Sequence, residues 1–277
     1  MKQNMKERVG IFKSIYILSP IIYDFLLSTL LLIILRMLFM GLVNGVFTEQ
    51  RDYILAHSEQ IAVYLDGVST LLCGLLFYWL YRKEREKSGD EAKKERMKVL
   101  LSAALPLVGL SASLALFLNL LFTRIDLASL SDTYESISNI QYSVPFAFGL
   151  FNYGIIKPIE EELVFRGLVY GRMRRYFPAA AAIPVSALLF GAYHGNMVQL
   201  TYGFLMGCLL AWSYERFQSL KASILVHSFA NIAVYTISCL SLSYVLLYTW
   251  GFVITGFLVI VFGIWLNREK VLSLLKH

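Results

Sequence analysis

Long apolar stretches separated by short polar segments dominate the pattern of this chain. Crossing the hydrocarbon core of a membrane takes about 20 mostly apolar residues in a helix. Stretches of this kind are residues 20–45, 61–81, 99–122 and 244–266, and apolar sequence interrupted by polar residues fills 144–240. The interrupted part divides into four further spans, at residues 144–170, 180–195, 198–214 and 222–240. The pattern therefore predicts an all-α, polytopic membrane helix bundle with about eight transmembrane helices.

The distribution of lysine and arginine gives this bundle an orientation, because these residues prefer cytoplasmic segments close to the helix ends. If both termini are cytoplasmic, the inner segments hold 20 of these residues and the outer segments hold only Arg51 and Arg124. We therefore expect both termini in the cytoplasm. The inner segment of residues 82–98 is the most charged, and its alternating signs are typical of a solvated loop with some helix.

Composition agrees with a membrane location and excludes several other classes. The 277 residues are 57% hydrophobic and 16% charged, and their mean hydropathy is +0.62, which is not the composition of a soluble protein. Basic loops next to anionic lipid headgroups explain the net charge of +6, so no nucleic-acid partner is expected. Cys73, Cys208 and Cys239 are widely spaced within predicted spans, so neither a disulfide framework nor a zinc spacing follows.

Residues 157–167 place three glutamates and an arginine inside an apolar region. Charged residues in a span are costly, and insertion scales give roughly 2.5–3.5 kcal/mol for Asp, Lys or Arg at a helix centre. Glu162 and Arg166 are four residues apart and share a helix face, which predicts an ion pair. Glu161 points about 100° away from Glu162 on a regular helix and lacks that partner, so it can act as a general base in an apolar pocket. A surface acidic cluster that stabilises a helix start would also explain these glutamates.

Two histidines lie on two further predicted spans. His194 follows Phe190 by four residues, and His227 precedes Asn231 by four, so that the imidazole and the amide share one helix face. A single histidine in a membrane usually makes an interhelical hydrogen bond. Two histidines on spans separate from the glutamates can, however, converge with them on one polar pocket.

Glu161, the two histidines and Asn231 together suit peptide hydrolysis. The reaction needs an activated water and donors aimed at the developing oxyanion. A glutamate with one histidine can provide the first, and the other histidine with the asparagine can provide the second, without a covalent nucleophile. The chain has no His-Glu-x-x-His zinc motif and no Gly-x-Ser-x-Gly nucleophile motif. Two histidines with Glu161 can in principle hold zinc, so a zinc-dependent membrane protease stays an alternative.

Other small or polar residues in the spans fit a structural role. Gly203 and Gly207 form a Gly-x-x-x-Gly pair that is typical of close helix packing. Asp24, Arg36 and Asp66 have no spacing that suggests a mechanism. We expect them to make interhelical hydrogen bonds or to reach the membrane interface.

At the glutamate and histidine motifs the chain resembles the CAAX-protease and bacteriocin-processing (CPBP) family, also called the ABI family, which includes the type II CAAX prenyl endopeptidases. The family motifs EExxxR, FxxxH and HxxxN are matched in order by Glu161 to Arg166, Phe190 to His194 and His227 to Asn231. A third glutamate, Glu160, precedes the first motif, and counting back from Arg166 identifies Glu161 and Glu162 as the motif pair. The resemblance covers about residues 144–240.

The resemblance implies an intramembrane glutamic endopeptidase without a cofactor or a bound metal. It implies three pairs of residues with distinct roles: Glu161 and His194 activate the hydrolytic water, His227 and Asn231 form the oxyanion site, and Glu162 and Arg166 support the helix. The expected partners are a peptide or membrane-tethered protein as substrate, and membrane lipids. Arg172, Arg174 and Arg175 follow the glutamate helix, so cleavage is expected near the cytoplasmic side.

The chain is then expected to have three parts. Residues 1–140 are N-terminal transmembrane helices with the charged loop 82–98, residues 141–240 are the catalytic core, and residues 241–277 are the last transmembrane helix and a cytoplasmic tail. The short loops and the lack of extra domains are more typical of a protein in a bacterial cell membrane. A non-catalytic membrane scaffold or bacteriocin-immunity protein, and a proton-coupled transporter, stay open as alternatives.

Overall fold

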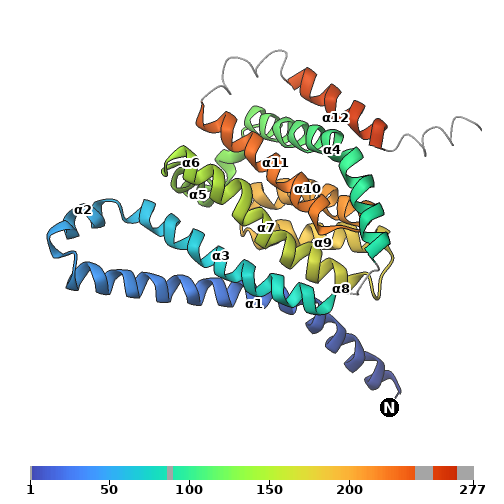
Figure 1. The fold of residues 1–277 in the computed structure, drawn as a ribbon, viewed down its shortest axis with the longest axis horizontal. Coiled ribbons are helices and arrows are strands. Elements are labelled where there is room, and N and C mark those ends of the chain that lie inside the picture. The colour runs from blue at the N-terminus through green and yellow to red at the C-terminus, as the bar shows by residue number, and fades with distance from the viewer. Residues whose placement is uncertain (1, 86–89, 241–251, 267–277) are drawn as a thin grey trace, which may run out of the picture.

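The computed structural model describes residues 2–85, 90–240 and 252–266, and each regular element among them is a helix (Figure 1). The N-terminal elements are α1 (Lys2–Gly45), the short turn η1 (Thr48–Gln50), α2 (Arg51–Ala56), α3 (Ser58–Glu84) and α4 (Asp90–Arg124). After the turn η2 (Leu127–Leu130) come α5 (Asp132–Tyr142), α6 (Phe146–Phe151), η3 (Asn152–Ile156), α7 (Lys157–Glu162), η4 (Leu163–Tyr170) and α8 (Gly171–Met173). The last elements are α9 (Ala179–Tyr193), α10 (Met197–Phe217), α11 (Leu220–Cys239) and α12 (Phe252–Leu266). The predicted all-α class is confirmed for the residues described.

Apolar helices dominate the bundle. Four are long and apolar enough to cross a membrane, and they are Phe12–Gly45, Ser58–Glu84, Arg96–Arg124 and Leu220–Cys239. On α1 the side chains of Phe25, Leu30 and Met37 are exposed, as expected for a helix surface that faces lipid. The chain is therefore an integral membrane protein. Eight spans and cytoplasmic termini stay predictions, and part of the last predicted span (241–251) and the predicted tail (267–277) lie outside the described residues.

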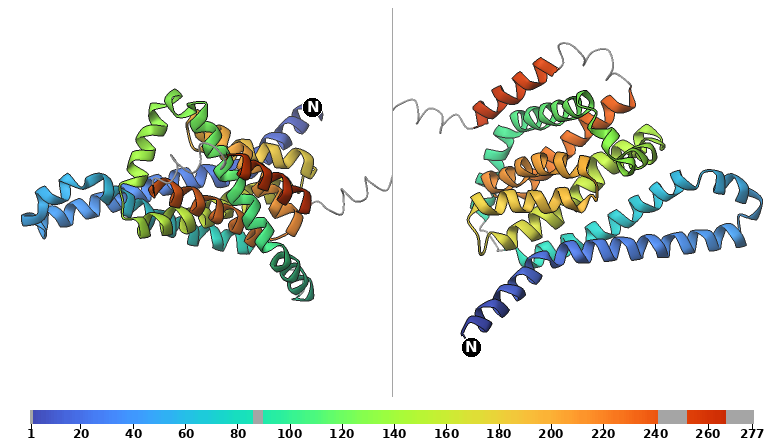
Figure 2. Two further views of the ribbon diagram at one scale, coloured as in Figure 1. Left: turned by 90° about the horizontal axis from the view of Figure 1, so that it is seen from above. Right: turned by 180° about the vertical axis from the view of Figure 1, so that it is seen from behind.

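The helices are layered from the α1–α3 hairpin to α12. α1 and α3 pack against each other, and α2 lies at the tip of their hairpin, which projects beyond the other helices (Figure 1). The run from α6 to α8 packs on α3, α9 and α10 pack on each other, and α11 lies against α4, which in turn carries α12 (Figure 2). The central position of the α6–α8 run places the glutamate segment inside the bundle.

A buried apolar core surrounds the glutamate segment. Its fully buried side chains include Phe77 of α3, Leu107 of α4, Phe165 of η4, Leu210 of α10 and Val226 of α11. Lipid is as apolar as these side chains, so close packing rather than exclusion from water stabilises such a core in a membrane. This cluster joins α3, α4, α10 and α11 to η4, which begins directly after the glutamates.

The α6–α8 run departs from a regular α-helix on both sides of α7. η3 and η4 are π-helical, and Pro158 lies in the first turn of α7. Proline has no N–H to donate to the preceding turn, so an irregular backbone before Pro158 is expected. Wider turns of this kind occur often at functional sites. Glu161 and Glu162 lie in the short α-helical part between the two π-helical segments.

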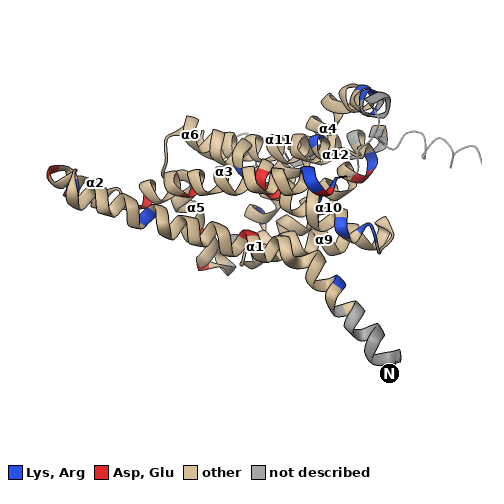
Figure 3. Ribbon diagram, turned by 60° about the horizontal axis from the view of Figure 1, so that its bottom comes forward, with Lys and Arg blue, Asp and Glu red and all other residues tan. Residues whose placement is uncertain are grey.

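Lysine and arginine residues gather mainly at one end of the bundle, the basic end, and the opposite end is the acidic end (Figure 3). At the basic end, contacts join Lys13 to Tyr176, Arg172 to Glu84 and Arg174 to Glu215. The described basic residues at this end include Lys13, Arg82, Lys83, Arg85, Arg172, Arg174, Arg175 and Arg216. The acidic end holds the loops before α3 and around α5, which a hydrogen bond from Gln60 to the Ser143 carbonyl joins. Its charged residues include Glu49, Arg51, Asp52, Arg124, Asp126, Asp132 and Glu135.

Glycines allow α9 and α10 to cross in direct backbone contact. A Cβ atom added to Gly191 would lie 2.5 Å from the Leu200 carbonyl oxygen, and one added to Gly203 would lie 2.8 Å from the Gly191 Cα atom. At Gly207 an added Cβ would lie 3.0 Å from the Cα atom of Ala187. The first two distances are too short for a side chain and the third is tighter than most Cβ contacts, so the close packing predicted at Gly203 and Gly207 is present.

Gly191→Ala is expected to separate α9 from α10, because the new methyl group would meet backbone that cannot rotate away. Overpacking of this kind costs about 1–3 kcal/mol or more. We expect a lower thermal unfolding midpoint for the purified protein in detergent. Gly41→Ala on α1 is the matched control, since an added Cβ there has nothing within 4 Å. Equal midpoints for the two variants would contradict the backbone contact.

Candidate active site

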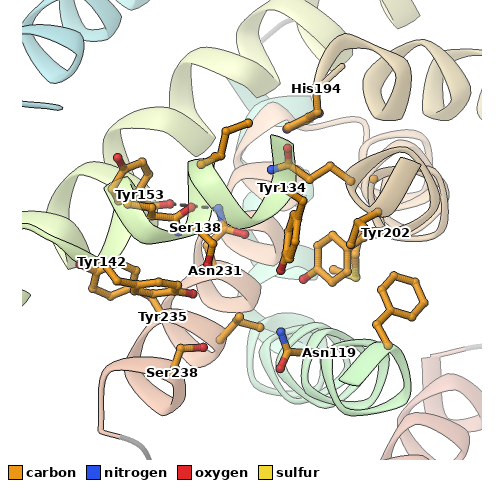
Figure 4. Close-up of a pocket in the computed structure, with 18 of the residues that line it drawn as sticks. Asn119, Tyr134, Ser138, Tyr142, Tyr153, His194, Tyr202, Asn231, Tyr235 and Ser238 are labelled. Carbon is orange, nitrogen blue, oxygen red and sulfur yellow. Dashed lines mark hydrogen bonds between the residues drawn. The ribbon is translucent and has the colours of Figure 1, made fainter. Parts of the chain in front are cut away.

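All four predicted catalytic residues line one cavity of about 1010 Å³. Glu161 comes from α7, His194 follows the end of α9, and His227 and Asn231 lie on α11. Figure 4 shows His194 at the top of the view and Asn231 near its centre, among several tyrosine rings. Residues separated by 70 positions in the sequence are thus brought to one place by the packing of α7, α9 and α11.

The predicted pair of Glu162 and Arg166 is present and completely buried. The Arg166 Nη1 atom lies 2.9 Å from Glu162 Oε1, and neither side chain is exposed. Arg166 also donates from Nη2 to the Gly207 carbonyl at 3.2 Å, and its guanidinium lies 4.4 Å from the centre of the Phe190 ring. Arg166 therefore ties the glutamate helix to both α9 and α10.

His227 lies between the two motif glutamates. Its Nδ1 atom is 2.9 Å from Glu162 Oε1, and its Nε2 atom is 3.5 Å from Glu161 Oε2. The Glu162 side chain is 0% exposed and the Glu161 side chain 15%, so only Glu161 reaches the cavity. The different directions expected for the two glutamates are therefore seen, but both carboxylates still reach the same imidazole ring.

Backbone carbonyls fix the other two candidate residues. The His194 Nδ1 atom lies 2.9 Å from the Phe190 carbonyl oxygen, which can only accept, so Nδ1 carries a proton and, in the neutral ring, Nε2 is the acceptor. Asn231 donates from Nδ2 to the Tyr153 carbonyl at 3.0 Å, the dashed contact in Figure 4, and keeps its second N–H. Each residue thus keeps one polar group for a ligand in the cavity.

The third glutamate, Glu160, points away from this cavity. Its buried carboxyl group hydrogen bonds to that of Asp24 on α1, and Asp24 accepts a hydrogen bond of 2.5 Å from the Tyr193 hydroxyl. The interhelical hydrogen bonding expected of Asp24 is therefore present. Three consecutive glutamates have three different environments, and Glu161 is the one that lines the cavity.

Several cavity residues were not predicted from the sequence. Lys157 and Asp66 form an ion pair of 3.1 Å beside Glu161, and both line the cavity. Both residues could have been identified as candidates from the sequence, because both are ionisable residues in predicted spans. The rings of Tyr142 and Tyr235, whose centres are 5.3 Å apart, also line it. These tyrosines come from separate elements without a common spacing, so no pattern in the sequence indicates them.

The described residues contain no group of three or more His, Cys, Asp or Glu side chains placed to hold a metal ion. His194, His227 and Glu161 share a cavity, but they do not form a three-ligand set in this arrangement. The residues instead supply a carboxylate, two imidazoles and an amide around a space that a peptide bond can enter.

Comparison with protein families agrees with the resemblance seen at the motifs. Residues 143–233 match the family described as type II CAAX prenyl endopeptidase Rce1-like. This range begins before α6 and ends within α11, so it contains all four candidate residues and the buried ion pair. No curated protein and no solved structure matches the chain. The predicted resemblance to this family is confirmed for residues 143–233.

Proposed function

Because residues 143–233 are Rce1-like, we propose that this chain is an intramembrane endopeptidase that hydrolyses a peptide bond of a membrane-associated protein or peptide. The proposal depends above all on Glu161. This carboxylate lines a large cavity together with two histidines and an asparagine, while its neighbours Glu160 and Glu162 are buried against other partners. A partly exposed carboxylate in an otherwise apolar bundle is suited to proton transfer.

Glu161 and His194 hold and activate the water. With its Nδ1–H donated to the Phe190 carbonyl, His194 offers Nε2 as an acceptor for one water hydrogen. Glu161 accepts the other hydrogen and removes this proton as the water oxygen attacks the carbonyl carbon of the substrate. A tetrahedral intermediate with a negatively charged oxygen results.

His227 and Asn231 donate to that oxygen. In this role both ring nitrogens of His227 carry protons, with Nδ1–H directed to Glu162 and Nε2–H to the oxyanion. The second N–H of Asn231 is the other donor. When the intermediate collapses, the C–N bond breaks and the proton held by Glu161 passes to the leaving nitrogen. The products are a carboxylic acid and an amine, and Glu161 is again ionised.

Glu162 and Arg166 act by positioning. The Arg166 guanidinium fixes the Glu162 carboxylate at 2.9 Å, and Glu162 in turn holds Nδ1 of His227 at 2.9 Å. The imidazole is therefore oriented from behind by a group that has no access to the cavity. Fixing a donor in advance of the reaction reduces the reorganisation needed in the transition state.

Cleavage of a fluorogenic peptide library by the purified protein in lipid nanodiscs tests this function. We expect cleavage that is unchanged by a zinc chelator, because the proposed mechanism uses only side chains. Loss of cleavage on chelation would replace it with the zinc-dependent alternative. If well-folded protein cleaves no peptide, the cavity would instead serve binding in a scaffold or immunity protein.

A further inference from the structure

The cavity opens at one end of the bundle. Its wall includes Glu161 and the buried His227, and also Tyr142 and Ser138 of α5, which are half-buried and labelled in Figure 4. It continues to Asp126, which is exposed. Exposure therefore increases from the candidate catalytic residues toward the segment between α4 and α6. This segment belongs to the acidic end of the molecule, as defined by its loops above.

The basic end is closed. Residues 162–173 are buried except Gly167 and Gly171, which are half-buried, so the helix beyond Arg166 leaves no space beside it. Arg172 pairs with Glu84 at 2.5 Å and also donates to the Ser19 hydroxyl, which joins α8, α3 and α1. Arg174 pairs with Glu215 at 2.9 Å and joins α8 to α10.

The ion pair between Arg174 and Glu215 persists at neutral pH. The hydrogen bonds from Arg174 lower the pKa of Glu215 below its usual value, and burial opposes this only in part. The carboxylate is therefore ionised under ordinary conditions, and the pair holds α8 against the end of α10. A substrate approaching from the basic end would have to break these contacts.

Charge tells which end faces the cytoplasm. Lysine and arginine near helix ends mark the cytoplasmic side, and they gather at the closed end (Figure 3). At the open end the acidic residues outnumber the two arginines, Arg51 and Arg124. The open end is accordingly on the non-cytoplasmic side.

We propose that the substrate is a peptide segment presented on the non-cytoplasmic side of the membrane, which reaches Glu161 through the opening between the end of α4 and α5. This inference rests on the proposed endopeptidase function. It places access on the side opposite to the one expected from the three arginines that follow the glutamate helix.

The size and lining of the cavity suit such a peptide. A volume of about 1010 Å³ equals the upper limit of ordinary small-molecule sites, which is roughly 1,000 Å³, so several peptide residues can enter. The wall combines tyrosine rings with polar groups from Asn119, Ser138 and Gln199. Rings can pack on side chains while amides and hydroxyls pair with a peptide backbone, whereas a purely apolar chain would leave those polar groups unpaired.

Labelling with a membrane-impermeant thiol reagent tests the direction of access. Asn231→Cys places a thiol deep in the cavity, and Ser138→Cys places one near the opening. We expect the small cationic reagent MTSET to modify both in intact cells. Ser219→Cys is the matched control, because Ser219 is half-buried like Ser138 but precedes α11 at the basic end. It should react only in inverted membrane vesicles.

The outcomes separate this inference from the proposed function, since labelling needs no activity. Wild-type protein, with Cys73, Cys208 and Cys239, gives the background in both preparations. The inference would be overturned if Asn231→Cys reacted only in inverted vesicles, as Ser219→Cys is expected to do. It would also be overturned by an Asn231→Cys thiol that reacts in neither preparation although Ser138→Cys reacts. Labelling from outside in a chain that cleaves no peptide would keep the access route and reject the protease.

Discussion

Glu161→Gln is expected to reduce peptide cleavage by about 10²–10⁴-fold, the range in which a positioned general base contributes. Glutamine keeps the shape of the side chain but cannot take a proton from water. The thermal unfolding midpoint should hardly change, because the Glu161 side chain is partly exposed to the cavity and its contact with His227 is long, at 3.5 Å. The measurement is the single-turnover rate with one cleaved peptide, for wild type and variant in the same lipid.

Glu160→Gln provides a matched control one residue earlier. Glu160 hydrogen bonds to Asp24 and does not line the cavity, and a glutamine amide can still donate to the Asp24 carboxylate. This variant should therefore cleave at close to the wild-type rate. Equal loss in both variants would mean that the glutamates support the fold rather than the reaction. Unimpaired cleavage by Glu161→Gln would remove Glu161 from the proposed mechanism.

The all-helical fold could be predicted because apolar stretches of membrane length carry a strong signal. α3 and α4 extend past the apolar residues predicted for them, since charged residues at their ends also form helix. The region of α6 to α8 was expected as one span, but it contains two π-helical segments. Local sequence apart from Pro158 does not encode these wider turns, which depend on how the run packs against α3 and α11.

The residues of the candidate site could be predicted from the sequence, but the contacts between them could not. A spacing of four residues correctly indicated the pair of Glu162 and Arg166, although part of the turn between them is π-helical. Helix geometry alone separated Glu161 from Glu162 and could not show that His227, 65 positions further on, contacts both. Such a contact depends on the crossing of α7 and α11, which no short pattern specifies.

The end at which the cavity opens could not be predicted from the sequence, for a similar reason. Arg172, Arg174 and Arg175 marked the cytoplasmic side, and their closeness in sequence to Glu161 suggested cleavage there. In the structure two of these arginines close that end through ion pairs with Glu84 and Glu215, which come from distant helices. Sequence distance along a helix therefore indicates depth in the membrane but not which end a ligand can reach.

Arg166→Met is expected to destabilise the protein by about 3–5 kcal/mol, since it leaves the Glu162 carboxylate buried without its partner. Glu162 and Arg166 are both fully buried, so water cannot take over the lost contact. Unfolding by SDS titration in mixed micelles measures the change. Arg36→Met on α1 is the control, because Arg36 is exposed and the same substitution there leaves no buried charge.

The double variant Glu162→Gln with Arg166→Met distinguishes an unpaired charge from lost packing. Replacing both members of a buried pair removes the uncompensated charge, so the double variant should be more stable than Arg166→Met alone. If the double variant is as unstable as the single one, the contacts of Arg166 with the Gly207 carbonyl and the Phe190 ring carry the stabilisation.

The cleavage rate of the double variant should stay below that of the wild type even when the variant is folded, because a neutral amide holds Nδ1 of His227 less firmly than the carboxylate does. Loss of Arg166 would then lower mainly the stability, and loss of the Glu162 carboxylate would lower mainly the cleavage rate. This is expected if Arg166 supports the fold and Glu162 positions the imidazole.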